Sequence, residues 1–522
     1  MKRRDFCKAL AGTLAAGVLY PGMTVQAAQT EKALVGRAVP DDYYTLWYRN
    51  DRSKSDSQHT YYYSESLFDH AATEYDNRLA LITLGMTAAA FSTGESDSRY
   101  WMTGEAGRAD HIRDAFAKLG FGEAEVFNYD HSLNEASQTV GCAIARKTLV
   151  RNGKQVTLIA AFLRGGGYGA EWSDNFYTGD GSAHRGFVLA ARQISGKIQD
   201  YVKRMEKKKA LGTLKFWLGG FSRSAAVANL VAARLPALLP RLSKSRFYVY
   251  TFATPASLTA ADCPELQQNY DNNHNADGTL KKSWGSSNIF NIISSGDIVP
   301  RVLPAEWGFH RNGNDRFLPS TQAPEELKAL NELGQQLEGK PVMQFDKLAT
   351  AEETDAVVKS LIELIGSRQN YHAVYEPIFR CMLQCVYTRS EEEVVDGVVL
   401  DDAAVVERLC AMDGMKQFSR EEIERNVKTA SAMYRPFLEQ FGDNVPLRVR
   451  QMALPLLAVG YCFNMDQDSL MLTATFVVSM LSESGQANDG MRAAMCHFVE
   501  NYFTLLEYYP PEEHGMQPYT RK

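Results

Sequence analysis

The sequence predicts an α/β fold with a mostly parallel sheet, and two observations carry this prediction. The middle of the chain holds four apolar runs of strand length: Val156–Leu163, Leu214–Leu218, Phe247–Ala253 and Asn288–Ile293. Segments typical of helices separate the first three runs, at His184–Met205 and Ser224–Leu239. Because strands that alternate with helices pair in parallel and are covered on both faces, we expect one such sheet here.

The first residues are typical of an export signal. Residues 1–8 are basic and contain Arg3-Arg4, residues 9–20 are apolar, and Val25-Gln-Ala27 fits a cleavage site with small residues. The apolar run is too short to span a bilayer, which takes about 20 residues. We therefore expect residues 1–27 to be a twin-arginine secretion signal that is removed after export. The mature protein is then periplasmic or extracellular.

Further elements are expected before the first apolar run. About residues 29–60 are polar and aromatic and predict an extended arm. Tyr75–Phe91 and His111–Phe121 have helical periodicity. We assign residues 28–320 to one core domain that includes this amino-terminal arm.

The character of the sequence changes at about residue 321. Thr350-Ala-Glu-Glu353 is a capping-box pattern that precedes apolar residues at helical spacing. Helical patterns continue to about residue 506. We therefore expect a helical insert at residues 321–366 and a helical carboxyl-terminal region at residues 367–522.

Composition limits the partners of the protein. The formal net charge is −6, whereas binding of nucleic acid requires a basic surface, so nucleic acid is excluded as the main partner. The eight cysteines form no Cys-x-x-Cys pair. Cys381 and Cys385 are four residues apart with no cluster of partner ligands, which favours a buried apolar stripe over a metal site. We expect no metal and no cofactor.

A serine stands where the second apolar run gives way to a helix. This is Ser222, in Gly220-Phe-Ser222-Arg-Ser224. A sharp turn from strand to helix requires small residues at its flanks, and Gly220 and Ser224 meet that requirement. A serine on such an elbow becomes a nucleophile when a base lies within hydrogen-bond reach. The alternative is a plain turn without chemistry.

A candidate orienting carboxylate and two candidate general bases follow Ser222 in the chain. Asp297 comes after the last apolar run, and a carboxylate at the carboxyl end of a strand is suited to orient a histidine. Two histidines come next, His310 and His372. His372 follows a polar loop at the start of the 367–522 region, so we predict it as the general base, with His310 as the alternative.

The first apolar run ends in a glycine cluster, Leu163-Arg-Gly-Gly166-Gly-Tyr-Gly169. Glycines after this strand offer exposed backbone N–H groups to a developing oxyanion. A phosphate-binding loop is the other interpretation of such a cluster, but the Gly-Lys-Ser/Thr ending that it needs is missing.

Together these segments resemble the class 3, or fungal-type, lipases of the α/β-hydrolase superfamily. Five motifs occur in the order of that family, and they cover about residues 156–304 with a weaker extension to His372. The motifs are Arg164-Gly-Gly166 with Asp174-Asn-Phe176 close behind, His184-Arg-Gly-Phe187, Gly220-Phe-Ser222-Arg-Ser224, Tyr250-Thr-Phe-Ala-Thr-Pro255 and Asp297-Ile-Val-Pro300.

The resemblance implies an α/β-hydrolase core and a role for each candidate. Ser222 would be the nucleophile, Asp297 the orienting acid and His372 the base. The backbone N–H groups of Gly166 and Arg223 would bind the oxyanion. Tyr168–Asp180 would be a mobile lid.

We therefore expect an exported serine hydrolase that forms an acyl-enzyme and cleaves carboxylic esters. The resemblance implies lipid esters as substrates, with transient contact to a membrane or micelle. One alternative is a short-chain esterase or thioesterase. The other is an inactive α/β-hydrolase fold that serves only in binding.

Overall fold

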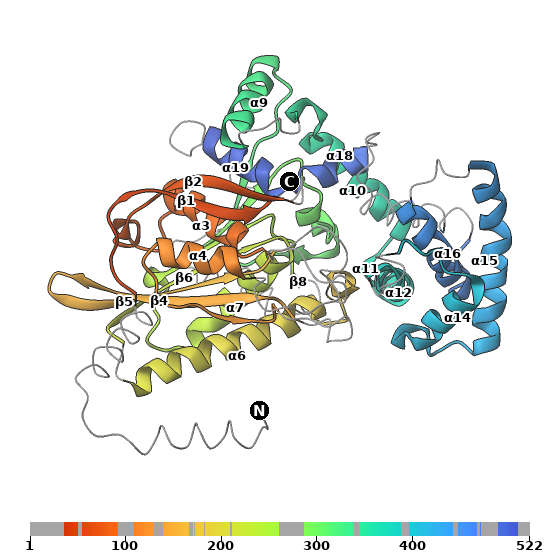
Figure 1. Ribbon diagram of the computed structural model, residues 1–522, viewed down its shortest axis with the longest axis horizontal. Helices are drawn as coiled ribbons and strands as arrows, with labels where there is room; N and C mark the ends of the chain where they lie inside the picture. Colours follow the sequence, from red (N-terminus) through yellow and green to blue (C-terminus); the bar gives the residue numbers. More distant parts are fainter. Residues whose placement is uncertain are drawn as a thin grey trace, which may run out of the picture.

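The computed structural model describes residues 36–50, 55–91, 109–129, 139–165, 171, 173–181, 183–208, 211–259, 287–338, 344–387, 396–441, 447–466, 470 and 489–509. A sheet of seven strands lies at its centre, in the order β11-β9-β7-β6-β5-β4-β3 (Figure 1). The strands are β3 (Glu125–Phe127), β4 (Cys142–Arg151), β5 (Lys154–Leu163), β6 (Thr213–Phe221), β7 (Phe247–Phe252), β9 (Ile289–Ser294) and β11 (Asn314–Leu318).

The sheet is mostly parallel, as predicted. Strands β5, β6, β7, β9 and β11 run parallel to one another, whereas β4 pairs antiparallel with β5 and β3 antiparallel with β4. The four predicted strands are β5, β6, β7 and β9. Their residues are buried almost without interruption, because side chains on both faces of the sheet are covered.

Helices cover both faces. Helices α6 (Arg185–Lys207) and α7 (Arg223–Leu238) pack on one face, and α3 (Asn77–Ala89) and α4 (Asp110–Lys118) lie over the other (Figure 1). The predicted extended arm is instead an antiparallel hairpin of β1 (Asp42–Arg49) and β2 (Asp56–Tyr63). Its alternate side chains, among them Leu46 and Tyr61, join the core on the α3 face.

The predicted insert and carboxyl-terminal region are helical. The insert holds α9 (Pro324–Glu338) and α10 (Ala351–Ile365). After it come α11 (Arg368–Asn370), the π-helical turn η8 (Tyr371–Tyr375), α12 (Glu376–Tyr387), α14 (Asp402–Ala411), α15 (Arg420–Phe441) and α16 (Leu447–Cys462). Helices α14 to α16 form a group beside the sheet, and their buried residues join the core on the α6 and α7 face (Figure 1).

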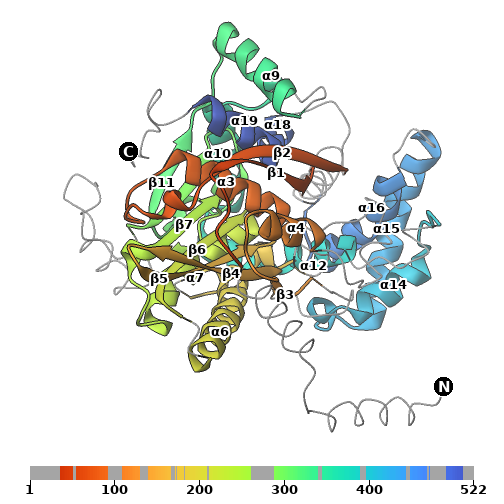
Figure 2. The same cartoon turned by 60° about the vertical axis from the view of Figure 1, so that its left-hand side comes forward.

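The last two described helices return to the other face of the sheet. Helix α19 (Val499–Tyr508) packs against α3 and α9, and α18 (Asp489–Met495) packs against α10 (Figure 2). The carboxyl-terminal region is thus divided between the two faces. None of the described helices is long and apolar enough to cross a membrane.

Candidate active site

Ser222 lies on a strained elbow between β6 and α7. Its backbone has φ 59° and ψ −129°, a positive φ that residues with a side chain rarely adopt. The turn is held from behind, because Ser222 N donates to the carbonyl of Phe252 in the neighbouring strand β7 (2.9 Å). The strain projects the side chain beyond the carboxyl edge of the parallel strands.

The geometry of the elbow explains which residues stand on either side of Ser222. A Cβ at Gly220 would lie 2.5 Å from the carbonyl oxygen of Ser224, so only glycine fits there. The Ser224 hydroxyl accepts a hydrogen bond from Phe221 N (2.9 Å) and lies within donor distance of the Phe221 carbonyl (2.8 Å). Ser224 therefore fixes the turn from within and is buried away from the site.

Ser222 and Asp297 meet at one histidine, and it is His497. Ser222 Oγ lies 2.7 Å from His497 Nε2, and His497 Nδ1 lies 2.9 Å from Asp297 Oδ2. In the tautomer that fits these bonds, Nδ1–H donates to the carboxylate and Nε2 accepts from the serine hydroxyl. The His497 side chain is 21% exposed and that of Asp297 is fully buried, so the histidine stands between the surface and the acid.

The Asp297 carboxylate receives three hydrogen bonds. Its Oδ2 accepts from His497 and from the hydroxyl of Tyr502 (2.7 Å), and its Oδ1 accepts from Val299 N (2.9 Å). Burial and the neighbouring carboxylate raise the pKa of Tyr502 well above its usual value. The phenol therefore stays protonated and donates a hydrogen bond to Asp297. Together these donors satisfy a buried negative charge and fix its orientation.

The predicted base, His372, lies elsewhere. It belongs to the π-helical turn η8, is 40% exposed, and its Nδ1 lies 3.2 Å from Glu376 Oε2. The alternative, His310, lies in β10 (Phe309–His310), with Nδ1 3.3 Å from the Gly308 carbonyl. Neither ring is hydrogen-bonded to Ser222 or Asp297. The physical reason is that η8 packs with α12. The turn after α18 and the start of α19 instead meet the ends of β6 and β9, at Ser222 and Ser294.

His497 is the residue at this candidate site that the sequence analysis did not propose. It follows α18 in a short turn, Cys496-His497-Phe498, before α19 begins at Val499. The order serine, acid, histidine holds for His497 as well as for His372. The apolar neighbours of His497 are typical of a buried helix, so the local pattern gave no sign of a catalytic loop.

Arg223 begins α7, and its guanidinium points away from the site. This side chain is buried and donates to Asn175 Oδ1 (2.8 Å) and to the Thr139 carbonyl (3.3 Å). Its backbone N–H is one of those at the positive amino-terminal end of α7, beside Ser222. The second predicted oxyanion donor, Gly166, lies outside the described residues.

The described part of the predicted lid is bonded to the helices after residue 367. Glu376 Oε2 accepts from Thr178 N (3.0 Å), Thr178 Oγ1 (2.6 Å) and Gly179 N (3.1 Å). The Tyr371 hydroxyl donates to the carbonyl of Phe176 (2.9 Å). This part of the Tyr168–Asp180 segment is therefore held by η8 and α12, and its release would require these buried bonds to break.

His184 also contacts this segment and makes stability depend on pH. Its Nδ1 accepts from Phe187 N at the start of α6 (3.3 Å), and its Nε2 lies 3.1 Å from the Asn175 carbonyl. Burial lowers the pKa of His184 to about 3, from about 6.5 in the unfolded chain. Below about pH 6.5 the unfolded chain therefore binds a proton that the folded protein excludes.

This proton lowers the free energy of unfolding as the pH falls from about 6.5 towards 3, by up to about 1.4 kcal/mol per pH unit. Above about pH 6.5 neither the folded nor the unfolded chain binds this proton, so the free energy of unfolding is not lowered by it. His184→Asn keeps a side-chain acceptor for the start of α6 and does not titrate. Urea unfolding at about pH 7 and pH 5 should show a smaller loss of stability in His184→Asn than in the wild type. Equal losses would contradict the prediction.

Comparison with known proteins gives one family match. The family model described as lipase (class 3) matches residues 164–307, which include Ser222 and Asp297. Comparison with curated proteins gives no match. The match confirms the resemblance for this segment and the predicted enzyme class, a carboxylester hydrolase.

Two of the solved structures that match part of this chain are lipases. A Rhizomucor miehei lipase–propeptide complex is 18% identical, with 48% of this chain and 69% of that chain covered and a TM-score of 0.30. A lipase from Rhizopus microsporus var. chinensis is 17% identical, with 45% and 74% covered and a TM-score of 0.29.

Proposed function

We propose that this carboxylester hydrolase, whose residues 164–307 match the class 3 lipases, cleaves lipid esters through Ser222, His497 and Asp297. The observation that carries the proposal is the chain of two short hydrogen bonds, from Ser222 Oγ to His497 and from His497 to Asp297. Serine, base and acid come from three distant segments, and their contacts are those that activate a serine hydroxyl.

The geometry supports the following sequence of steps. Ser222 Oγ attacks the ester carbonyl carbon while His497 Nε2 takes its proton, and Asp297 stabilises the imidazolium that forms. The tetrahedral intermediate collapses, the C–O bond to the alcohol breaks, and Nε2–H protonates the leaving oxygen. The acyl group is now an ester of Ser222. Water attacks it with His497 again as the base, and the acid is released.

The negative oxygen of the intermediate needs hydrogen-bond donors. We assign one to the backbone N–H of Arg223, since it adjoins Ser222 at the amino-terminal end of α7. The second donor remains the proposed backbone N–H of Gly166. Loss of one such donor generally lowers the rate by about 10²–10³-fold.

Export and substrate class belong to the same proposal. The basic and apolar residues 1–27 support export to the periplasm or the medium. Recovery there of a chain that begins at Ala28 would agree with it, and an uncleaved chain retained inside the cell would contradict it. The family match supports lipid esters.

The test is labelling with a fluorophosphonate, followed by rate measurements in buffer and with micelles on p-nitrophenyl esters from acetate to palmitate and on one acyl thioester. We expect one adduct, on Ser222, and rates that increase with acyl length in the presence of micelles. Highest rates on acetate or on an acyl thioester would favour a short-chain esterase or thioesterase. Absence of an adduct under both conditions would favour a binding protein without catalysis.

A further inference from the structure

The amino-terminal end of α10 lies against the turn before Asp297 and against α18, which precedes His497. It is closed by a capping box. Thr350 Oγ1 accepts from Glu353 N (3.2 Å), and Thr350 N donates to Glu353 Oε2 (2.8 Å). The Thr350 N–H and the neighbouring Arg492 guanidinium hold the pKa of Glu353 below its usual range, so this carboxylate is charged at neutral pH. One of its oxygens is thus used by the cap, and the other faces α18.

That second oxygen binds the helix that precedes His497. Glu353 Oε1 accepts from Arg492 Nη1 (2.7 Å), and Arg492 lies in α18. The same guanidinium donates from Nη2 to the Leu348 carbonyl (2.8 Å) and from Nε to the Lys347 carbonyl (3.3 Å). Three acceptors, two just before α10 and one in its first turn, therefore fix one arginine that lies five residues before His497.

The same segment also contacts the turn that carries Asp297. Thr354 Oγ1 donates to the carbonyl of Gly296 (2.8 Å), and both residues are buried. A Cβ at Gly296 would lie 2.2 Å from the Ala349 carbonyl oxygen, so the turn and the segment are in close contact. The start of α10 thus touches the supports of both the acid and the base.

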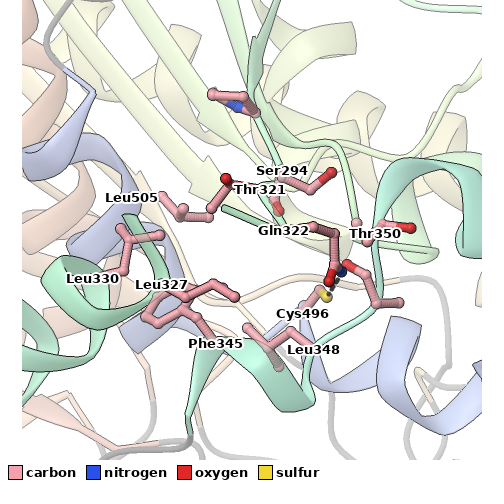
Figure 3. A pocket seen from close by; sticks show the side chains of 14 residues that line it. Ser294, Thr321, Gln322, Leu327, Leu330, Phe345, Leu348, Thr350, Cys496 and Leu505 are labelled. Atoms are coloured by element: carbon pink, nitrogen blue, oxygen red, sulfur yellow. Dashed lines mark hydrogen bonds between the residues drawn. The ribbon is translucent and has the colours of Figure 1, made fainter. Parts of the chain in front are cut away.

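A small pocket adjoins this junction. This pocket, of about 30 Å³, lies between the Gly296 turn, α9, the segment before α10, and α19, and its wall includes Leu348, Thr350, Cys496 and Leu505 (Figure 3). This volume has room for about two water molecules and none for an ester substrate.

We propose that Glu353 and Arg492 form a brace that positions His497 between Ser222 and Asp297. Neither residue is in contact with the reacting atoms, so both are positioning residues of the proposed ester hydrolysis, on which this inference rests. Displacement of a catalytic group by about 1 Å can lower a rate about 10²-fold. The pair itself is partly exposed, with side chains 22% and 32% accessible, and such pairs contribute little to stability.

Glu353→Gln separates positioning from folding. Glutamine also serves in a capping box, so the bond to Thr350 N is kept while the charge that holds Arg492 is removed. We expect kcat to fall about tenfold or more, KM to stay unchanged, and the melting temperature to change little. Glu352→Gln is the matched control, because it removes the neighbouring charge in the same helical turn and should leave kcat unchanged.

Arg492 provides the reciprocal variants. Arg492→Met should lower kcat as Glu353→Gln does, and Arg492→Lys should restore part of the loss. The double variant should be no slower than the slower single variant, because both changes remove one interaction. Unchanged kcat in both single variants, equal loss in Glu352→Gln, or a loss that follows the melting temperature would overturn the brace.

A readout without substrate separates this inference from the proposed function. The Nδ1–H of His497, bonded to Asp297, should give a downfield proton NMR signal that is missing in His497→Ala. We expect Glu353→Gln to shift or broaden this signal whether or not the wild type cleaves esters. A signal identical to that of the wild type would overturn the brace even if ester hydrolysis were confirmed.

Discussion

Ser222→Ala is expected to abolish ester hydrolysis, with kcat lowered by roughly 10⁶-fold. The alanine has no hydroxyl to attack the ester and none to donate to His497 Nε2, while the rest of the elbow is unchanged. The measurement is kcat on the best p-nitrophenyl ester, together with fluorophosphonate labelling. Ser224→Ala is the matched control, since this second serine of the motif is buried and bonds only within the protein.

The control should lose stability but still hydrolyse esters, because the nucleophile and the base remain. Removal of the Ser224 hydroxyl leaves Phe221 N without that acceptor, which generally costs about 1–3 kcal/mol. Labelling of Ser222 should persist in this variant. Retained hydrolysis in Ser222→Ala, or an adduct on Ser224, would contradict the assigned nucleophile.

The same position should show a conflict between stability and activity. A φ of 59° at a residue with a side chain costs about 1–3 kcal/mol, and glycine avoids most of that cost. Ser222→Gly is therefore expected to unfold at a higher temperature than Ser222→Ala, although both are inactive. A lower melting temperature for the glycine variant would argue against strain at the elbow.

His497→Ala is expected to lower kcat by about 10⁴–10⁶-fold, whereas His372→Ala and His310→Ala should remain within about threefold of the wild type. The reason is the pair of bonds that His497 makes to Ser222 and Asp297, which neither of the other two rings makes. All three variants should be compared at saturating substrate, after circular dichroism has shown that they are folded.

His372→Ala also serves as a test of the helical region. It removes the ring near Glu376 and leaves the bonds of that carboxylate to Thr178 and Gly179 in place. A small loss of stability without a loss of kcat agrees with our assignment. Inactivation by His372→Ala together with an active His497→Ala would instead restore the base that the sequence predicted.

The sequence could predict the centre of the sheet because its strands are buried on both faces. Such strands appear as continuous apolar runs, and β5, β6, β7 and β9 were found in this way. Strand β11 was missed because most of its residues, Asn314–Leu318, are polar and only half-buried. The hairpin β1–β2 was missed because its tyrosines and polar residues hide the alternation of buried and exposed side chains along each strand.

The candidate site could be predicted only where local geometry creates a local pattern. Gly220 and Ser222 are recognisable because the elbow itself excludes larger residues at its flank. Asp297 is recognisable because it follows a buried strand. His497 has no such pattern, since its position depends on how α18 and α19 return to the α3 face, which is a property of the whole fold.

The distance along the chain between Ser222 and His497, 275 residues, has a consequence for the time at which activity arises. During synthesis the elbow and the acid emerge long before the histidine, and domains generally fold as the chain emerges. A nascent chain therefore holds a serine without its base until α18 has docked beside α10. If the proposed mechanism holds, incomplete chains cannot cleave esters, and we expect a protein truncated before residue 497 to retain the proposed nucleophile and to be catalytically inactive.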